Sequence, residues 1–278
     1  MRMRQNDTIP SDDRGLAYGD GVFETVLVQG GQPSLWRWHC ARLMRGCRRL
    51  GFEPPDQAAL DTFVIDVPAD GCYVLKLIVT RGSGGQGYCQ PLQPVPRIVR
   101  RLMPFAPQPE RWQQGVEVRI CTLIMSYQPR LAGIKHLNRL ENVLARQEWQ
   151  TPSIAEGLLC NARGEVIEAT AMNVAWYDNG RWCTPHTHEC GVTGTLSAAL
   201  IEAGLLVPST LALTSLSAVR HVCVFNSVQG VWPIRQVVNA QGSPLSSHDI
   251  HSASVRAFQQ RAHTLLGYTS DDAVLFDR

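Results

Sequence analysis

The sequence lacks any long apolar run. Nowhere do about eighteen consecutive apolar residues occur, the rough length that a membrane-spanning helix needs, and the arginines of the first residues are not followed by the apolar stretch of a secretion signal. The formal net charge is only +2, so the total charge gives no indication of binding to nucleic acid or to a membrane surface. We therefore expect a cytoplasmic protein with a small-molecule substrate that binds neither nucleic acid nor a membrane.

The sequence also lacks a C-x-x-C pair, although it contains nine cysteines. An odd number of scattered cysteines fits reduced, buried thiols better than a disulfide framework. The segment Cys183–Cys190 brings two cysteines and two histidines together, so zinc has to be considered there. Structural zinc sites usually draw on two separated ligand pairs, and we therefore expect free cysteines and no metal.

No internal repeat and no low-complexity segment interrupts the 278 residues, of which 44% are hydrophobic. This length and composition are those of an ordinary globular protein with one large or two modest domains. Three prolines within Met103–Glu110 cannot continue a strand ladder, which makes this segment the best boundary. We expect an N-terminal α+β domain over residues 1–106 and a second domain over residues 107–278.

Hydrophobic periodicity predicts strands and helices in mixed order. The expected strands are 22–28, 74–80, 97–102, 115–123, 156–159, 166–169, 173–177, 181–184 and 222–226. The expected helices are 57–64, 137–149, 195–203, 249–265 and one that ends at Gly51, with Ser34 as its N-cap. Runs of strands broken by single helices favour two α+β domains over a doubly wound parallel sheet.

Lys135 stands out because an apolar run delivers it to the start of the expected helix 137–149. A buried amine tends to lose its charge, and a neutral amine can form a Schiff base with an aldehyde. Considered by itself, a lysine that snorkels at a helix start is the more common case.

Three other groups could belong to the same chemistry. The turn Gly191–Gly194 precedes a helix and so suits a phosphate, although such turns often do no more than begin a helix. Arg42 could bind phosphate with two donors, but other arginines share its helix. Glu168 ends a strand, where a carboxylate could keep a pyridine nitrogen protonated or be an exposed strand-end residue.

These pieces occur in an order that resembles the fold type IV pyridoxal-phosphate enzymes. The motifs that carry the resemblance are Lys-His-Leu-Asn-Arg-Leu-Glu-Asn at 135–142, Glu-Ala-Thr-Ala-Met-Asn at 168–173, His-Cys-Ala-Arg-Leu at 39–43 and the turn at 191–194. Within that class, segments 11–25 and 81–88 are most similar to the aminodeoxychorismate lyases. The likeness runs from about Ser11 to the C-terminal helix.

The resemblance implies a homodimer of two-domain chains with pyridoxal 5'-phosphate at the domain interface. It implies that Lys135 forms the Schiff base and carries a proton, with Thr25 as a catalytic proton donor or relay. The residues that it assigns to the cofactor are Lys135, Arg42, Glu168, Asn173, Val192, Thr193 and Ser227.

The implied reaction converts 4-amino-4-deoxychorismate to 4-aminobenzoate and pyruvate. A D-amino-acid or branched-chain aminotransferase of the same fold is the main alternative, and a cofactor-free binding protein with a structural Lys135 is another. Relatives often carry a second arginine in the glycine-rich loop where this chain has Gln86, so Arg81 or Lys76 is expected to help bind a substrate carboxylate, with Gln86 and Tyr88 nearby.

Overall fold

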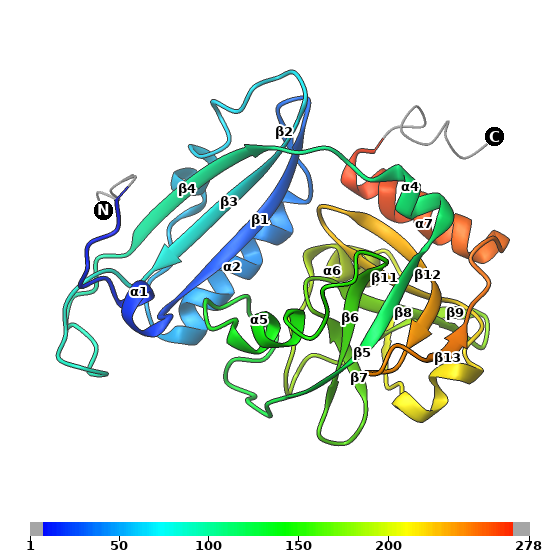
Figure 1. Ribbon diagram of the computed structural model, residues 1–278. Helices are drawn as coiled ribbons and strands as arrows, with labels where there is room; N and C mark the ends of the chain where they lie inside the picture. The colour runs from blue at the N-terminus through cyan, green and yellow to red at the C-terminus, as the bar shows by residue number, and fades with distance from the viewer. Residues whose placement is uncertain (1–7, 269–278) are drawn as a thin grey trace. The chain divides into compact units, whose positions relative to one another are not determined.

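The computed structural model describes residues 8–268, and the chain divides into two compact units. The first unit extends to Ala106 and also contains Ile134–Arg139, whereas the second contains Pro107–Gly133 and the chain from Leu140 onward. Residues 1–7 and 269–278 of the two expected domains lie outside the described residues. Figure 1 shows that each unit combines a sheet with helices, as the expected α+β class requires.

The first unit is built on an antiparallel sheet whose strand order is β2-β1-β3-β4. Its elements are α1 (Arg14–Tyr18), β1 (Gly21–Gln29), β2 (Gln32–Pro33), α2 (Trp36–Leu50), α3 (Gln57–Asp61), β3 (Cys72–Thr80) and β4 (Arg97–Pro104). Apolar side chains of α2, such as Leu43 and Cys47, form one core with Val22, Val26 and Leu77 of the sheet. The strand residues between these, such as Phe23 and Thr25, therefore lie on the opposite face.

The start of α2 differs from the expected one. The N-cap position belongs to Leu35, in the left-handed region with φ of 54°, and no described side chain caps it. Ser34 follows β2 directly, and its backbone N–H donates to Leu27 O at 2.8 Å. The prediction of Ser34 as N-cap was wrong because the hairpin pairing holds this residue back in the strand connection.

The second unit contains a mixed sheet in the order β10-β9-β8-β11-β12-β5-β6-β7, with β13 beside β12. Its strands are β5 (Val116–Met125), β6 (Ile154–Asn161), β7 (Val166–Ala169), β8 (Asn173–Asp178), β9 (Arg181–Pro185), β10 (Val207–Ser209), β11 (Val222–Asn226), β12 (Gly230–Val238) and β13 (Pro244–Ser247). Its helices are α4 (Pro109–Gln114), α5 (Leu140–Arg146), α6 (Thr195–Glu202), the 3₁₀ helix η1 (Leu213–Ala218) and α7 (Ala253–Leu266). Helices α4 and α7 pack on β12.

Strand β12 lies in the middle of this sheet, between β11 and β5, yet the sequence pattern did not predict it. Pro233 interrupts it, and proline cannot donate to a strand ladder, so the local sequence argues against a central strand. The register with β5 shifts between Ile234 and Gln236, directly after the proline. Tertiary packing thus overrides the local signal.

Helix α5 is shorter than expected and does not contain the residues after Lys135. It begins at Leu140, and residues 135–137 form an isolated antiparallel bridge with β1. The expectation that Lys135 opens a helix was therefore wrong, because the backbone of this segment bonds to a strand.

The nine cysteines are all free, as expected, and seven of them are buried. In residues 8–268, no helix is both long and apolar enough to cross a bilayer.

Candidate active site

Lys135 is fixed by strand-like pairing of its own segment with the start of β1. Phe23 N–H donates to Lys135 O at 2.9 Å, and Leu137 N–H donates to Gly21 O at 3.0 Å. The ammonium Nζ of Lys135 lies 4.6 Å from the centroid of the Phe23 ring. These two bonds hold the backbone of Lys135 beside β1, and its side chain lies over the Phe23 ring.

A polar row crosses the sheet on the face that carries Phe23. Thr25 is directly opposite Lys76 on β3, and Lys76 is directly opposite Arg101 on β4. The Lys76 Nζ lies 5.3 Å from the Phe23 ring centroid, so two lysine amines approach one ring. Neither Lys76 nor Arg101 has a carboxylate partner within residues 8–268. Like charges directly opposite each other destabilise a sheet, and this row is therefore suited to an anion.

Arg42 belongs to a buried polar trio on the opposite, α2-facing side of β1. Glu24 accepts from Arg42 Nε at 2.8 Å and from Nη2 at 2.5 Å, and His39 Nδ1 lies 2.6 Å from the same carboxylate. The exposed fractions are 1% for Glu24, 0% for His39 and 6% for Arg42. Arg42 and His39 are three residues apart on α2, so both face β1.

The protonation of this trio follows from its burial and its charges. Burial by itself would raise the pKa of Glu24, but the charge and hydrogen bonds of Arg42, together with His39, lower it to about 2. Burial lowers the pKa of His39 below its usual 6.5, more than Glu24 raises it. Glu24 is therefore ionised and His39 neutral at pH 7, and His39 Nδ1 donates because a carboxylate can only accept.

Glycines shape the turn before α6 in the second unit. Gly191 has φ of +78°, which other residues rarely adopt, and a Cβ on Gly194 would come within 1.8 Å of Asn173 Oδ1. No described side chain caps the start of α6. The positive end of this eight-residue helix therefore opens at Gly194, as an anion site requires.

The backbone N–H groups expected at a phosphate have partners within the protein. Val192 N–H donates to Glu168 Oε2 at 2.8 Å, and Thr193 N–H donates to Gly133 O at 3.2 Å. The hydroxyls of Thr193 and Thr187 lie 2.7 Å apart. The turn thus contributes its shape, its threonine hydroxyls and the helix end that follows it.

Glu168 lies at the end of β7 and is 3% exposed. Besides Val192 N–H, the amide of Asn142 contacts its carboxylate, with Nδ2 at 3.4 Å from Oε1. The buried location excludes the exposed strand-end alternative. A buried carboxylate of this kind is suited to accept a further hydrogen bond from the N–H group of a ligand ring.

Asn173 supports the turn itself. Its Nδ2 donates to Val192 O at 3.0 Å, and its carboxamide fills the space beside Gly194. Asn173 was expected among the cofactor residues, and the structure places it as a brace of the glycine turn.

Glu156 is a supporting residue that the sequence analysis missed. Its carboxylate accepts from Thr170 Oγ1 at 2.5 Å and from the backbone N–H groups of Thr170 and Ala171 at 3.1 and 3.2 Å. This contact holds the loop that follows Glu168. A glutamate in a strand otherwise rich in apolar residues is the signal that could have revealed it.

Ser227 follows β11 in a tight turn and is 9% exposed. Asn226 Oδ1 organises this turn by accepting from Val228 N–H at 2.9 Å and Gln229 N–H at 2.7 Å. The Ser227 hydroxyl has no hydrogen-bond partner within residues 8–268, which leaves it available to a ligand.

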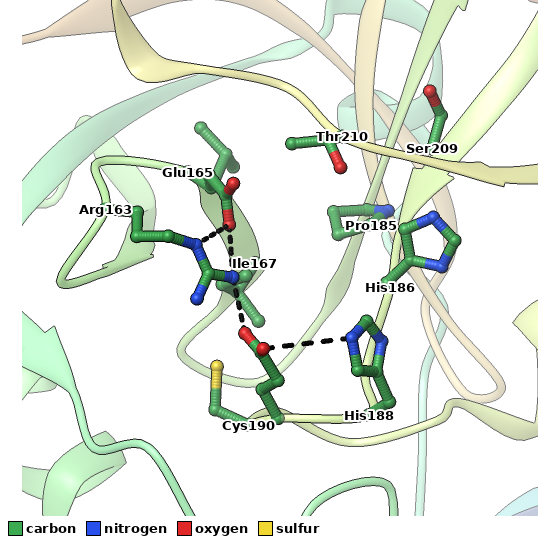
Figure 2. Close-up of a pocket in the computed structure, with 11 residues that line it drawn as sticks. Arg163, Glu165, Ile167, Pro185, His186, His188, Cys190, Ser209 and Thr210 are labelled. Atoms are coloured by element: carbon green, nitrogen blue, oxygen red, sulfur yellow. Dashed lines mark hydrogen bonds and ion pairs between the residues drawn. The ribbon is translucent and has the colours of Figure 1, made fainter.

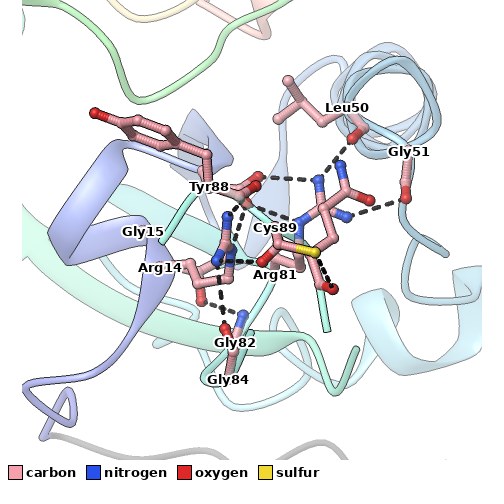
Figure 3. A network of polar contacts seen from close by, with 12 residues as sticks. Arg14, Gly15, Leu50, Gly51, Arg81, Gly82, Gly84, Tyr88 and Cys89 are labelled. Atoms are coloured by element: carbon pink, nitrogen blue, oxygen red, sulfur yellow. Dashed lines mark hydrogen bonds and ion pairs between the residues drawn. The ribbon is translucent and has the colours of Figure 1, made fainter. Parts of the chain in front are cut away.

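Arg81 is buried and committed to structural partners, as Figure 3 shows. It pairs with Asp20, with Nε at 2.7 Å from Oδ2, and it donates to the carbonyls of Leu50 and Gly51 at 2.6 and 3.0 Å. These contacts fasten the end of α2 to the segment after β3. With a further bond from Nη2 to Asp20 Oδ1, four of the five guanidinium N–H groups have partners, so this placement differs from its expected role at a substrate carboxylate.

Arg14 holds the glycine-rich loop that contains Gln86 and Tyr88. Its guanidinium donates to the carbonyls of Gly84, Gly87 and Cys89 at 3.0 to 3.3 Å (Figure 3). Gln86 is exposed, and Tyr88 is 87% exposed. The Arg14 guanidinium thus holds the loop together, and the residues at the tip of the loop are exposed to solvent.

A cavity of about 230 Å³ lies elsewhere in the second unit (Figure 2). The contacts around it include ion pairs of Arg163 with Glu165 and with Glu189, and it also borders His186 and His188. None of the expected cofactor or catalytic residues lines it. In residues 8–268, no group of three histidine, cysteine or carboxylate side chains is arranged to hold a metal.

Known proteins share both the sequence and the fold. The family model for class IV amino-transferases matches residues 21–237. The aminodeoxychorismate lyase of Vibrio harveyi is 31% identical over 233 residues, 81% of this chain and 86% of that protein. The one from Bacillus subtilis is 27% identical over 72% of this chain and 70% of that protein.

Solved structures agree with this result. A crystal structure of 4-amino-4-deoxychorismate lyase from Pseudomonas aeruginosa is 37% identical and superposes with a TM-score of 0.81, covering 94% of this chain and 96% of that one. The branched-chain amino acid aminotransferase of Escherichia coli, 18% identical, shares the fold with a TM-score of 0.77 over 95% of this chain and 91% of that one. The expected fold type IV architecture is confirmed, and the chain belongs to the class IV aminotransferase family.

Proposed function

We propose that the protein is a pyridoxal-phosphate-dependent lyase that converts 4-amino-4-deoxychorismate to 4-aminobenzoate and pyruvate. The observation that carries this proposal is the Lys135 amine on the Phe23 ring, on a sheet face that also carries Thr25 and the cationic residue Lys76. Two similar proteins, 31% and 37% identical, bear the name of this lyase.

The donor set fits pyridoxal phosphate. Lys135 would hold the aldehyde, and Arg42, Ser227, Thr193 and the start of α6 would hold the phosphate. Glu168 would accept a hydrogen bond from the pyridine nitrogen, while Asn173 and Val192 keep the glycine turn in shape. The bound cofactor supplies an aldehyde for amines and a protonated ring that withdraws electrons. The buried carboxylate, the space required at Gly194 and the unpartnered Ser227 hydroxyl support this fit.

Two residues of the first unit move protons in the proposed reaction. The Lys135 amine takes the proton from the substrate ring carbon that bears the amino group. The Thr25 hydroxyl passes a proton toward the methylene carbon that becomes the methyl group of pyruvate. Thr25 and Phe23 are two residues apart on β1, so the Thr25 hydroxyl and the Lys135 amine lie on the same face of this strand.

A pair of Thr25 variants tests the proton relay. Thr25→Val keeps the branched shape but removes the hydroxyl, and we expect kcat to fall by about 100-fold, the lower end of general acid–base effects. Thr25→Ser keeps the hydroxyl and is expected to stay close to the unmodified enzyme. Equal turnover of the valine and serine variants in a 4-aminobenzoate assay would exclude the relay.

Lys76, with Arg101 beside it, is proposed to bind a substrate carboxylate, since Arg81 is committed to Asp20. Lys76→Met should raise KM about 10-fold or more, because a charge-assisted contact is worth roughly 1.5–3 kcal/mol. Lys76→Arg should retain most of the affinity. Steady-state kinetics with the purified variants measures both, and an unchanged KM in the methionine variant would refute the role.

The two enzymes differ in their need for an amino-group acceptor, because an aminotransferase requires a keto acid and the lyase does not. The purified protein is mixed with 4-amino-4-deoxychorismate without any keto acid, and we expect 4-aminobenzoate and pyruvate in equal amounts. Turnover of D-amino acids or branched-chain amino acids that requires a keto acid, with no aromatic product, would establish the aminotransferase instead. A colourless protein that does not take up the cofactor would indicate a binding protein.

We also propose that the enzyme is a cytoplasmic homodimer. The free cysteines suit a reducing compartment, and the family resemblance implies the dimer. Light scattering should give twice the mass of one chain.

A further inference from the structure

We propose that Glu24 and His39 are positioning residues that aim Arg42 at the phosphate of the cofactor. The tightness of phosphate binding then depends on the buried trio and not on Arg42 by itself. This inference rests on the proposed pyridoxal-phosphate function.

The geometry of the trio fixes the direction of the guanidinium. Glu24 takes both Nε and Nη2 of Arg42, at 2.8 and 2.5 Å. Two parallel contacts to a planar fork define its plane, whereas a single contact leaves it free to rotate. The direction of the third nitrogen, Nη1, is thereby set by a residue on β1 and not by Arg42's own helix.

His39 in turn fixes the carboxylate. Its Nδ1–H donates to Glu24 Oε2, the same oxygen that receives Arg42 Nη2. Because His39 is neutral, it adds a directional hydrogen bond to Glu24 without adding a second positive charge beside Arg42. A protonated His39 would compete with Arg42 for the carboxylate.

Burial makes each of these contacts consequential. All three residues are at most 6% exposed, so water does not replace a lost donor. Removal of the His39 ring nitrogen leaves one carboxylate oxygen with a donor missing, and the carboxylate and the guanidinium then have room to rotate together. The effect should appear at the phosphate and not at the aldehyde end of the ligand.

A purely structural role makes a different prediction. If the trio only joins α2 to β1, its variants lower stability and weaken all ligands of the site equally. The comparison of pyridoxal phosphate with pyridoxal separates the two cases, since both carry the aldehyde and only one carries the phosphate.

The experiment measures equilibrium binding of each ligand to full-length apoprotein, followed by the change in ligand absorbance. His39→Leu should weaken pyridoxal phosphate about 5- to 10-fold, because the lost hydrogen bond to ionised Glu24 acts on the phosphate only through Arg42, and it should leave pyridoxal unchanged. His39→Asn, whose amide nitrogen can replace Nδ1, should restore binding to within about twofold. Glu24→Gln should show a larger loss of the same phosphate-specific kind.

His221 provides the matched control. It is also buried, 3% exposed, and its Nδ1 makes a 2.8 Å contact with Asp249 O in the second unit. His221→Leu should lower the melting temperature without changing the ratio of the two affinities.

The outcomes are distinct. A lower phosphate-specific affinity in His39→Leu that His39→Asn restores supports the proposal. An unchanged ratio in His39→Leu overturns it, even if stability falls, and this variant decides the matter if Glu24→Gln does not fold. Failure of the unmodified protein to bind either ligand would overturn the proposed function as well.

Discussion

Replacement of Lys135 by alanine is expected to lower kcat by at least about 10,000-fold, the upper end of what one acid–base group contributes, because the proposed function uses this amine both as cofactor attachment and as proton carrier. The assay is formation of 4-aminobenzoate and pyruvate. The absorption band of the lysine-bound cofactor should also disappear.

Lys76→Ala is the control for this prediction. Its ammonium approaches the same Phe23 ring, at 5.3 Å against 4.6 Å for Lys135, so it tests whether any amine at this ring suffices. We expect Lys76→Ala to keep the absorption band. A Lys135→Ala protein that retained both the band and substantial turnover would refute the assignment.

Glu24→Gln is expected to lower the free energy of unfolding by about 3 kcal/mol. The substitution leaves Arg42 charged and buried without its carboxylate, and loss of one partner of a buried ion pair typically costs about 3–5 kcal/mol. Urea denaturation measures the change. Asp66→Asn is the comparison, because Asp66 pairs with Arg100 at 3.3 Å but has a side chain that is 72% exposed, and it should have little effect.

The pH dependence has a defined sign. The pKa of Glu24 falls from 4.5 to about 2 on folding, so the stabilisation is fully present above pH 4.5 and is lost as the pH falls through 2. The stability difference between the unmodified protein and Glu24→Gln should therefore shrink in acid. A difference that stays constant from pH 7 to pH 2.5 would contradict the ionised, paired state of Glu24.

Local pattern predicted the strands well where alternation or an apolar run is strong. Strands β7 and β11 match the expected ranges at both ends, and β1 and β3 extend the expected ones by one or two residues. These predictions depend on periodicity within a few residues. The errors at Ser34 and at the start of α5 arise where backbone groups bond to a distant strand.

The residues of the candidate site also differ in whether a local sequence pattern reveals them. Lys135 and Glu168 were singled out from short motifs, because the chemistry proposed for them depends on residue type and spacing. The partner of Arg42 was not recognised, since Glu24 is eighteen positions away and belongs to another element. Its signal is a carboxylate at an inward-facing position between Val22 and Val26.

The sequence by itself determined the family and the kind of chemistry, because the reactive residue types and their order along the chain suffice to identify both. The tertiary structure decided which charged side chains form ion pairs with one another. Arg81 is tied to Asp20 and Arg42 to Glu24, whereas Lys76 and Arg101 have no carboxylate partner within residues 8–268. An ion pair depends on distance and burial, and both are set by packing between elements that are remote in sequence.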